Sequence, residues 1–323
     1  MKNGNLYKLL FDHMLNGLAH CSIVYDDNGR AIDWRYIAVN PAFEKQTRLM
    51  DVVGKLASEV IPGIHTSDPE ILEIYAHCAE TLLPQRFERY LQALQGWYEV
   101  TVFSHEKGTF TAVFDVVTYR KQMEITLYQE RSALEQAYDE TMVGWARALE
   151  LRNQETKGHS ERVVEMLDRL ARVMGIEEAK LIHYRRGALL HDIGKMGIPD
   201  TILLKPGDLT EDERGTMSLH PELAYMLMKP IHFLEPALDI PYCHHERWDG
   251  SGYPRGLKGK QIPLSARLFS VVDVYDAMLS NRVYREGMEK KYVLEYIKSM
   301  SGSYFDPEVV TNFLGMFENG EAK

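Results

Sequence analysis

The chain has 323 residues, which is long for one compact domain and typical of two. Hydrophobic residues make up 45% and charged residues 26% of the chain, as in soluble globular proteins. The formal net charge of -10 argues against a general binder of nucleic acid or anionic membranes, because such proteins usually carry a broad basic surface.

No secretory signal or membrane span is predicted. The amino terminus lacks an uninterrupted apolar core with a small-residue cleavage site, and no stretch approaches the roughly 18 apolar residues that cross a bilayer. Cys21, Cys78 and Cys243 are widely separated and give neither a disulfide framework nor a metal clip. We therefore expect a cytoplasmic protein with neither a membrane nor nucleic acid as partner.

Residues 1–121 are predicted to form a small α+β domain. The Asn-Gly pair within Asp26–Gly29 is a strong hairpin signal, and Asn40-Pro41 precedes a helical stretch at 42–48. Alternating or continuous apolar residues predict two antiparallel strand pairs. The four strand-like stretches are 21–25, 33–39, 96–103 and 108–118.

The order of these elements, with the exit sequence Asp115–Gln122, resembles a PAS sensor domain. The resemblance implies a regulatory domain that can hold a ligand, whose identity the sequence does not give. His65, His77 and His105 are available for a haem. Histidines in such a fold are more often surface residues, and we expect these to be so.

Residues 122–149 are predicted to form one long connecting helix, because they contain no proline and a single glycine. Apolar residues recur along it at spacings of three to seven. This stripe fits a parallel coiled coil in a homodimer or a helix that packs onto its own chain, and both interpretations stay open. The stripe consists of Leu127, Leu134, Tyr138, Met142 and Trp145.

Residues 150–323 are predicted to form an all-α domain that contains several metal-ligand candidates. His191 and Asp192 are adjacent at the end of an apolar helix, so their side chains diverge by about 100° and can hold one metal or bridge two. Glu155 and His159 are four residues apart and would share a helix face, although this spacing alone favours a solvated face.

Three further features point to buried polar groups. His220 precedes Pro221, which places it at a break between two helices, and Thr210 offers a capping box to the first of them. Asp273 lies among valines, and a buried carboxylate needs a cation or hydrogen-bond donors. His244 and His245 are adjacent, whereas His183 and His232 have no such neighbours and are expected to be structural.

These candidates are too many for one tetrahedral zinc ion. All of them donate nitrogen or oxygen and none is a thiolate, which predicts two or three ions of iron, manganese or a similar divalent metal. The predicted ligands are His159, His191, Asp192, His220, His244, His245 and Asp273, with Glu155 as a candidate eighth.

The stretches HDIGKMGIPDTILLKPGDLT, HPELAYMLM, HHERWDGSGYPRGLKGKQIPLSARLFSVVDVYDAM and NRVYR resemble the HD-GYP family, a branch of the HD-domain metallohydrolases. The match runs from about Ala148 to Arg285. It implies a helical domain with a bi- or trinuclear metal centre and phosphodiesterase activity on cyclic di-GMP, with pGpG and then GMP as products.

The resemblance also divides the ligands. It implies one metal held by His159, His191, Asp192 and Asp273, and a second held by His220, His244 and His245, with Asp192 as the bridge. Members with three metals have a glutamate where Glu155 stands, so a third ion is expected.

Substrate contacts are implied as well. Lys195 is expected to reach the phosphate, and Arg282 and Arg285 to hold the second phosphate or a guanine edge, because planar guanidinium suits bidentate contacts. The signature residues Gly252, Tyr253 and Pro254 are expected to serve substrate entry or partner binding. The catalytic residues are thus predicted to be Asp192 and Lys195.

Two alternatives stay open beside hydrolysis of cyclic di-GMP under control of the PAS-like domain. One is a phosphodiesterase specific for 3',3'-cyclic GMP-AMP, because the choice between guanine and adenine depends on few contacts. The other is a catalytically weak receptor that binds nucleotide. The expected protein partners are a second copy of the chain and signalling proteins such as diguanylate cyclases.

Overall fold

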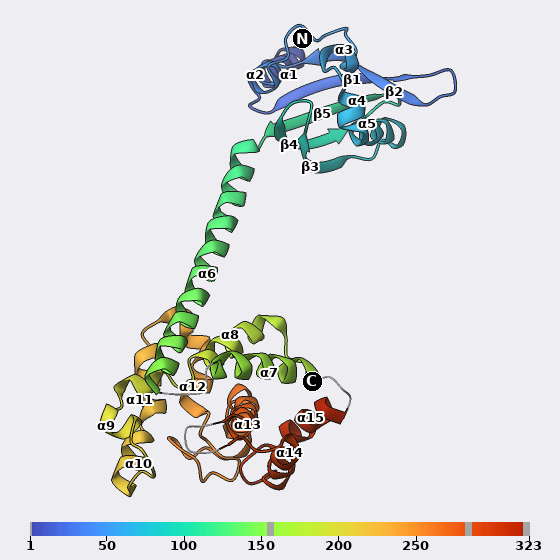
Figure 1. Cartoon of the computed structure of the whole chain (residues 1–323). Helices are drawn as coiled ribbons and strands as arrows, with labels where there is room; N and C mark the ends of the chain where they lie inside the picture. Colours follow the sequence, from blue (N-terminus) through green and yellow to red (C-terminus); the bar gives the residue numbers. More distant parts are fainter. Residues whose placement is uncertain (1, 154–157, 282–285, 319–323) are drawn as a thin grey trace. The chain divides into compact units, whose positions relative to one another are not determined.

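The computed structural model describes residues 2–153, 158–281 and 286–318 (Figure 1). Contacts divide the chain into two compact units, Met1–Ser132 and Ala133–Lys323. Helix α6, Thr118–Asn153, contributes residues to both units. Within the described ranges, no helix combines the length and the apolar character needed to cross a membrane.

A five-stranded antiparallel sheet forms the centre of the first unit, with strand order β2-β1-β5-β4-β3. The four predicted strands are confirmed. Strand β3 was not expected, because its charged residues alternate along an exposed edge of the sheet. The strands are β1 (Gly17–Tyr25), β2 (Ala31–Val39), β3 (Gln85–Leu91), β4 (Gly96–Phe103) and β5 (Thr109–Val116).

Short helices connect β2 to β3. Asn40 begins α2 by accepting a hydrogen bond from the backbone of Phe43, which confirms the helix predicted after Asn40-Pro41. Helix α5 packs on β2, β4 and β5 and buries Ile71 and Tyr75. The helices of this unit before α6 are α1 (Lys2–His13), α2 (Pro41–Thr47), α3 (Ala57–Val60), α4 (Ile64–Ser67) and α5 (Pro69–Thr81).

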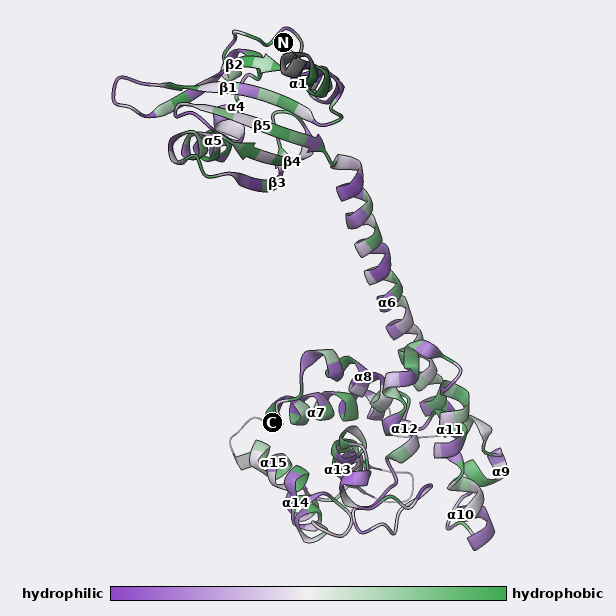
Figure 2. Cartoon of the chain, turned by 180° about the vertical axis from the view of Figure 1, so that it is seen from behind, coloured by the Kyte–Doolittle hydropathy of each residue, from purple (hydrophilic) through white to green (hydrophobic). Residues whose placement is uncertain are grey.

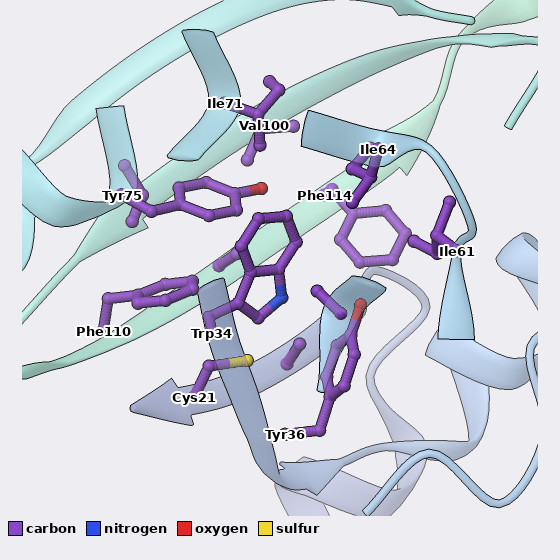
Figure 3. Packing of buried hydrophobic residues seen from close by; sticks show 14 of the residues in the cluster. Cys21, Trp34, Tyr36, Ile61, Ile64, Ile71, Tyr75, Val100, Phe110 and Phe114 are labelled. Carbon is purple, nitrogen blue, oxygen red and sulfur yellow. The ribbon is translucent and has the colours of Figure 1, made fainter. Parts of the chain in front are cut away.

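The interior of the first unit is aromatic and apolar, as Figure 3 shows. Tyr75 stacks on Phe110 with ring centroids 4.4 Å apart, and Trp34 meets Tyr75 edge-on at 5.3 Å. A cavity of only about 50 Å³ lies among these side chains, which leaves no room for a haem. His77 and His105 are exposed, as expected, but the expectation is wrong for His65, which is half-buried and lies 3.1 Å from buried Asp33.

Helix α6 contains the whole predicted helix and extends beyond it at both ends. Hydrophilic and hydrophobic residues alternate along it (Figure 2). Leu127 and Leu134 are 67% and 52% exposed, whereas Met142 is buried and packs with residues of its own chain. The stripe therefore has an exposed part and a part that is covered within the second unit.

Every named element of the second unit that the structure describes is helical, which confirms the predicted all-α class. Its largest core cluster joins α7, α8, α13, α14 and α15. The α-helices after α6 are α7 (His159–Val173), α8 (Glu178–Leu189), α9 (Asp200–Leu203), α10 (Glu211–Met217), α11 (His220–Met228), α12 (Asp239–Cys243), α13 (Leu264–Leu279), α14 (Lys290–Ser299) and α15 (Pro307–Glu318). The 3-10 helices in the described part of this unit are η1 (Ile193–Gly197), η2 (His232–Ala237) and η3 (Gly259–Gln261).

Candidate metal centre

Among the described residues, two groups of three potential ligand side chains lie in the second unit. Within each group one ligand atom per residue lies within 4.8 Å of the others. The first group is His159, His191 and Asp273, and the second is His220, His244 and His245. The family resemblance implied the same division of these six residues.

Asp192 lies between the two groups. Its Oδ2 is 3.2 Å from Nε2 of His191, while its Oδ1 is 3.3 Å from Nε2 of His220 and 3.9 Å from Nε2 of His244. One carboxylate oxygen thus faces each group. This is the arrangement that a bridging ligand requires, and it brings all seven described candidates together.

Three of the ligand candidates lie at or beside helix ends, whereas Asp273 lies within α13. His159 and His220 are the first residues of α7 and α11, and His244 follows α12. His220 indeed follows a break after α10, and Thr210 and Glu213 form the expected capping box. The ends of α7, α11 and α12 therefore meet at the candidate metal centre.

The prediction that His191 and Asp192 end a helix is wrong. Helix α8 ends at Leu189, and the two residues lie in the turn before η1. The reason is packing: a Cβ atom on Gly194 would lie 1.9 Å from the carbonyl oxygen of His220, so only glycine lets η1 approach α11. This approach places Asp192 beside His220.

The imidazoles of the centre are oriented by hydrogen bonds at Nδ1. Nδ1 of His191 lies 2.8 Å from the carbonyl oxygen of Ala188, and Nδ1 of His220 lies 2.8 Å from that of Met217. A carbonyl only accepts, so each Nδ1 carries the proton and each Nε2 presents its lone pair to the centre. Metal ligands need this tautomer.

Asp276 performs the same task for His159 and was missing from the predicted site. Its Oδ2 accepts from Nδ1 of His159 at 2.7 Å, and Arg162 donates to the same carboxylate. Burial would raise the pKa of Asp276, but His159 and Arg162 lower it to about 2. The only signal in the sequence was its position three residues after Asp273.

The protonation states suit metal binding. Burial lowers the pKa of His245 to about 3 and that of His244 well below its ordinary value, with neighbouring imidazoles adding to the effect. Burial opposes ionisation of Asp192, yet Lys195, His191 and His220 hold its pKa well below the usual range. The centre thus offers neutral imidazoles and an ionised carboxylate.

The donor set fits cations that prefer nitrogen and oxygen ligands, such as iron or manganese. Cys243 adjoins the histidine pair, but burial raises the pKa of its thiol to about 11, so it is a packing residue. Nitrogen and carboxylate atoms that converge in a buried space need a cation to compensate them. The described residues therefore fit a centre of two metal ions.

Lys195 lies in η1 with its ammonium group in contact with Oδ2 of Asp192. It is three residues after Asp192, within a 3-10 helix. Its side chain is 18% exposed. The cation is therefore at the edge of the centre, beside the proposed bridge.

The signature loop touches the centre at His245. The Tyr253 ring lies 4.8 Å from the His245 ring, and burial raises the pKa of Tyr253 to about 12. A Cβ atom on Gly252 would lie 2.5 Å from the carbonyl oxygen of His245. Glu246 accepts hydrogen bonds from the backbone N–H groups of Arg255 and Leu257 in the same loop and so shapes the local fold. Pro254 follows Tyr253 through a cis peptide bond.

Three predicted site residues, Glu155, Arg282 and Arg285, lie outside the described residues. The third metal ion and the arginine contacts to substrate therefore remain predictions from the sequence. His183 and His232, which we expected to be structural, belong to neither ligand group.

The chain is similar in sequence to several known proteins. The chain is 40% identical over 194 residues to the cyclic di-GMP phosphodiesterase response regulator RpfG of Xanthomonas campestris, an alignment that covers 59% of this chain and 51% of that protein. It is 33% identical over 312 residues to a cyclic di-GMP phosphodiesterase of Vibrio cholerae, covering 88% and 61%. It is 35% identical over 179 residues to 3'3'-cGAMP-specific phosphodiesterase 2 of Vibrio cholerae, covering 55% and 34%.

The chain thus spans between about a third and three fifths of the length of these relatives. The model of the HD domain family matches residues 145–309, just over half of the chain. The matched range contains every described member of the two ligand groups and Asp192. The chain belongs to the HD domain family.

Proposed function

We propose that the chain is a metal-dependent phosphodiesterase that hydrolyses cyclic di-GMP to pGpG, and further to GMP. The observation that carries this proposal is the pair of facing ligand groups with one oxygen of Asp192 toward each. The names of relatives that align with the second unit support the substrate class.

The protein's own residues prepare the chemistry. Two bound divalent ions would supply an activated water and offset the charge on the phosphate oxygens. Asp192 would be shared between the two groups, and Asp276 keeps His159 in the tautomer that presents Nε2. Lys195 would turn from Asp192 toward a phosphate oxygen. Because the activated water would be the nucleophile, no nucleophilic side chain is required.

The substrate contacts form the second part of the proposal. Arg282 and Arg285 would hold the second phosphate or a guanine edge, and Gly252, Tyr253 and Pro254 would border the entry. Tyr253 supports this placement, since its ring lies against His245. A third ion would be held with the help of Glu155.

Product analysis tests the proposal. Metal-replete protein is incubated anaerobically with cyclic di-GMP and with 3',3'-cyclic GMP-AMP separately, under iron or manganese, and the products are separated by chromatography. We expect pGpG to form faster than any product of cyclic GMP-AMP. No hydrolysis of either would favour the alternative of a nucleotide-binding receptor.

Specificity for cyclic GMP-AMP is the second candidate function, because a relative with that printed specificity aligns over 179 residues. The same experiment decides between the two substrates. Faster turnover of cyclic GMP-AMP would replace cyclic di-GMP as the proposed substrate.

Metal analysis tests Glu155. The wild-type chain and Glu155→Ala, reconstituted side by side, should differ by about one ion per chain. Equal metal content would remove the third ion from the proposal and leave the two-ion centre unaffected.

Regulation by the first unit is also proposed. The order of its strands and helices supports a PAS-like sensor, and its apolar cavity supports a small ligand. Ala112 lines this cavity, so Ala112→Leu would fill it. We expect kcat to change at least about fivefold, the lower end of typical coupling energies, and an unchanged kcat would speak against control through the cavity.

A homodimer through α6 completes the proposal. Leu127 and Leu134 are exposed and seven residues apart, as in one stripe of a coiled coil. Light scattering should give twice the chain mass for wild type and a lower mass when both leucines are replaced by serine. A monomeric wild type would contradict the dimer. Signalling partners such as diguanylate cyclases would then be sought with the dimer.

A further inference from the structure

The last turn of α6 contacts two segments that carry proposed metal ligands. Glu150 and Arg152 are two residues apart near the carboxyl end of this helix. Glu150 reaches the start of α7, and Arg152 reaches the end of η1. All these contacts lie inside the second unit.

Arg152 holds the segment that follows Asp192. Its guanidinium donates to the carbonyl oxygens of Lys195 and Met196 at 3.1 Å and to that of Ile198 at 2.9 Å. It also pairs with Asp200 at 2.7 Å. A cation is favourable at the carbonyl end of a helix, and the planar guanidinium can meet several acceptors at once.

This support matters because η1 is a 3-10 helix, whose internal hydrogen bonds have poor geometry. The segment carries Lys195 and directly follows Asp192. Without Arg152, three carbonyl groups at its end would lose a charged donor. The position of the Asp192–Lys195 pair therefore depends on a side chain of α6.

Glu150 holds the other segment. Its carboxylate accepts from the backbone N–H of Ser160 at 2.9 Å and from that of Gly158 at 3.3 Å. These donors flank His159, the first residue of α7. An acidic side chain stabilises the positive end of a helix, so Glu150 fixes the place at which His159 enters the centre.

We infer that Glu150 and Arg152 are positioning residues that set the separation between His159 and Asp192, and that α6 controls the metal centre through them. The inference rests on the proposed phosphodiesterase and names its point of regulation. Asp192 lies between the two ligand groups and His159 belongs to one of them. A displacement of about 1 Å at a reacting centre can cost a hundredfold in rate.

The test uses the full chain with Arg152→Gln, which removes the positive charge and most of the planar set of guanidinium N–H donors. Arg147→Gln is the matched control, since Arg147 is on the same helix and its ion pair with Glu161 is solvent-exposed. Calorimetric titration of metal-free protein with Mn²⁺ gives the affinity, and steady-state assays with Mn²⁺ give kcat and KM separately.

We expect Arg152→Gln to raise the Kd for Mn²⁺ about tenfold and to lower kcat at saturating Mn²⁺ about tenfold, the range seen when a group that orients a metal ligand is lost. KM should stay within about twofold, because Arg152 would not touch the substrate. Glu150→Ala should act in the same direction. Values equal to those of Arg147→Gln would overturn the inference.

Two further outcomes separate the inference from the proposed function and from a folding defect. If wild type binds Mn²⁺ but hydrolyses no cyclic dinucleotide, the proposed function fails, and the Mn²⁺ titration alone still judges the inference. If Arg152→Gln does not fold, Arg152→Lys takes its place, since it keeps the charge but loses the planar fork. A Kd for Mn²⁺ equal to that of wild type would then overturn the inference.

Discussion

The interiors of the two units differ in what their buried polar groups contact. In the first unit, buried Asp68 accepts hydrogen bonds from the backbone of Gln92 and Ala93, and Asn40 caps a helix. In the second unit, Nε2 of His220 lies 3.3 Å from Nε2 of His244. Backbone partners in the first case make the polar group part of the fold.

Facing imidazole nitrogens have another meaning. The Nδ1 atoms of His220 and His244 lie at backbone carbonyls, so both Nε2 atoms present lone pairs to the same space. Such an arrangement is unfavourable without a cation. The direction in which the free donor or acceptor of a buried polar group points therefore distinguishes a ligand from a structural residue better than its burial does.

The largest effect is expected from Asp192→Asn, which keeps the shape but removes the charge between the groups. Loss of a residue that only orients a metal ligand costs about 10 to 100-fold. Loss of the proposed bridge should therefore lower kcat more than about 100-fold and reduce the metal content. The control is Asp208→Asn, because Asp208 is exposed. If Asp192→Asn changed kcat and metal content no more than Asp208→Asn does, the contrast between structural and ligand residues would be wrong.

A smaller effect is expected from Gly252→Ala. The added Cβ would lie 2.3 Å from the backbone nitrogen of Arg247 and 2.5 Å from the carbonyl oxygen of His245, so the loop or His245 must move. We expect about a tenfold loss of kcat. In Gly215→Ala the Cβ has open space on a helix, so this control should keep its activity and gain up to about 1 kcal/mol of stability.

The metal-free second unit should lose stability on mild acidification. The pKa of His245 is about 3 when folded, below its ordinary value, so below about pH 6.5 the unfolded chain binds a proton that the folded chain refuses. Stability is complete above that pH and falls toward pH 3, by at most about 1.4 kcal/mol per pH unit for this residue.

Chemical denaturation at pH 7.5, 6.5 and 5.5 measures this dependence. His245→Gln should make this dependence shallower, because one of the imidazoles with a lowered pKa is gone. A free energy of unfolding that is the same at all three pH values in wild type would show that the imidazole does not resist protonation.

The smallest effect on the metal centre is expected from Phe110→Ala in the first unit. Phe110 is 1% exposed, and its loss should destabilise that unit by about 3 to 5 kcal/mol. The Mn²⁺ content should nevertheless equal that of wild type. A parallel loss of Mn²⁺ would mean that the stability of the first unit and the metal centre of the second are coupled.

The sequence predicted those parts of the site that local motifs carry. Short motifs that can be recognised from the sequence contain five of the ligand candidates, and the structure brings these together. They are His191, Asp192, His220, His244 and His245. Strand β3 was missed because exposed charged residues do not produce the apolar pattern of a buried strand.

Partners that support the ligands could not be predicted in this way. Asp276 meets His159 across 117 positions of the sequence, and Arg152 reaches Ile198 across 46. Neither pair has a spacing that a helix or a turn imposes. Such contacts depend on how the helices pack, which a pattern along one chain does not specify.

The central claim is that Asp192 joins two adjacent cation sites. Electron paramagnetic resonance of the wild-type chain, reconstituted anaerobically with Mn²⁺, tests it most directly. We predict the signal of exchange-coupled ions in wild type and its loss in Asp192→Asn. A wild-type spectrum that contains only isolated Mn²⁺ ions would contradict the account.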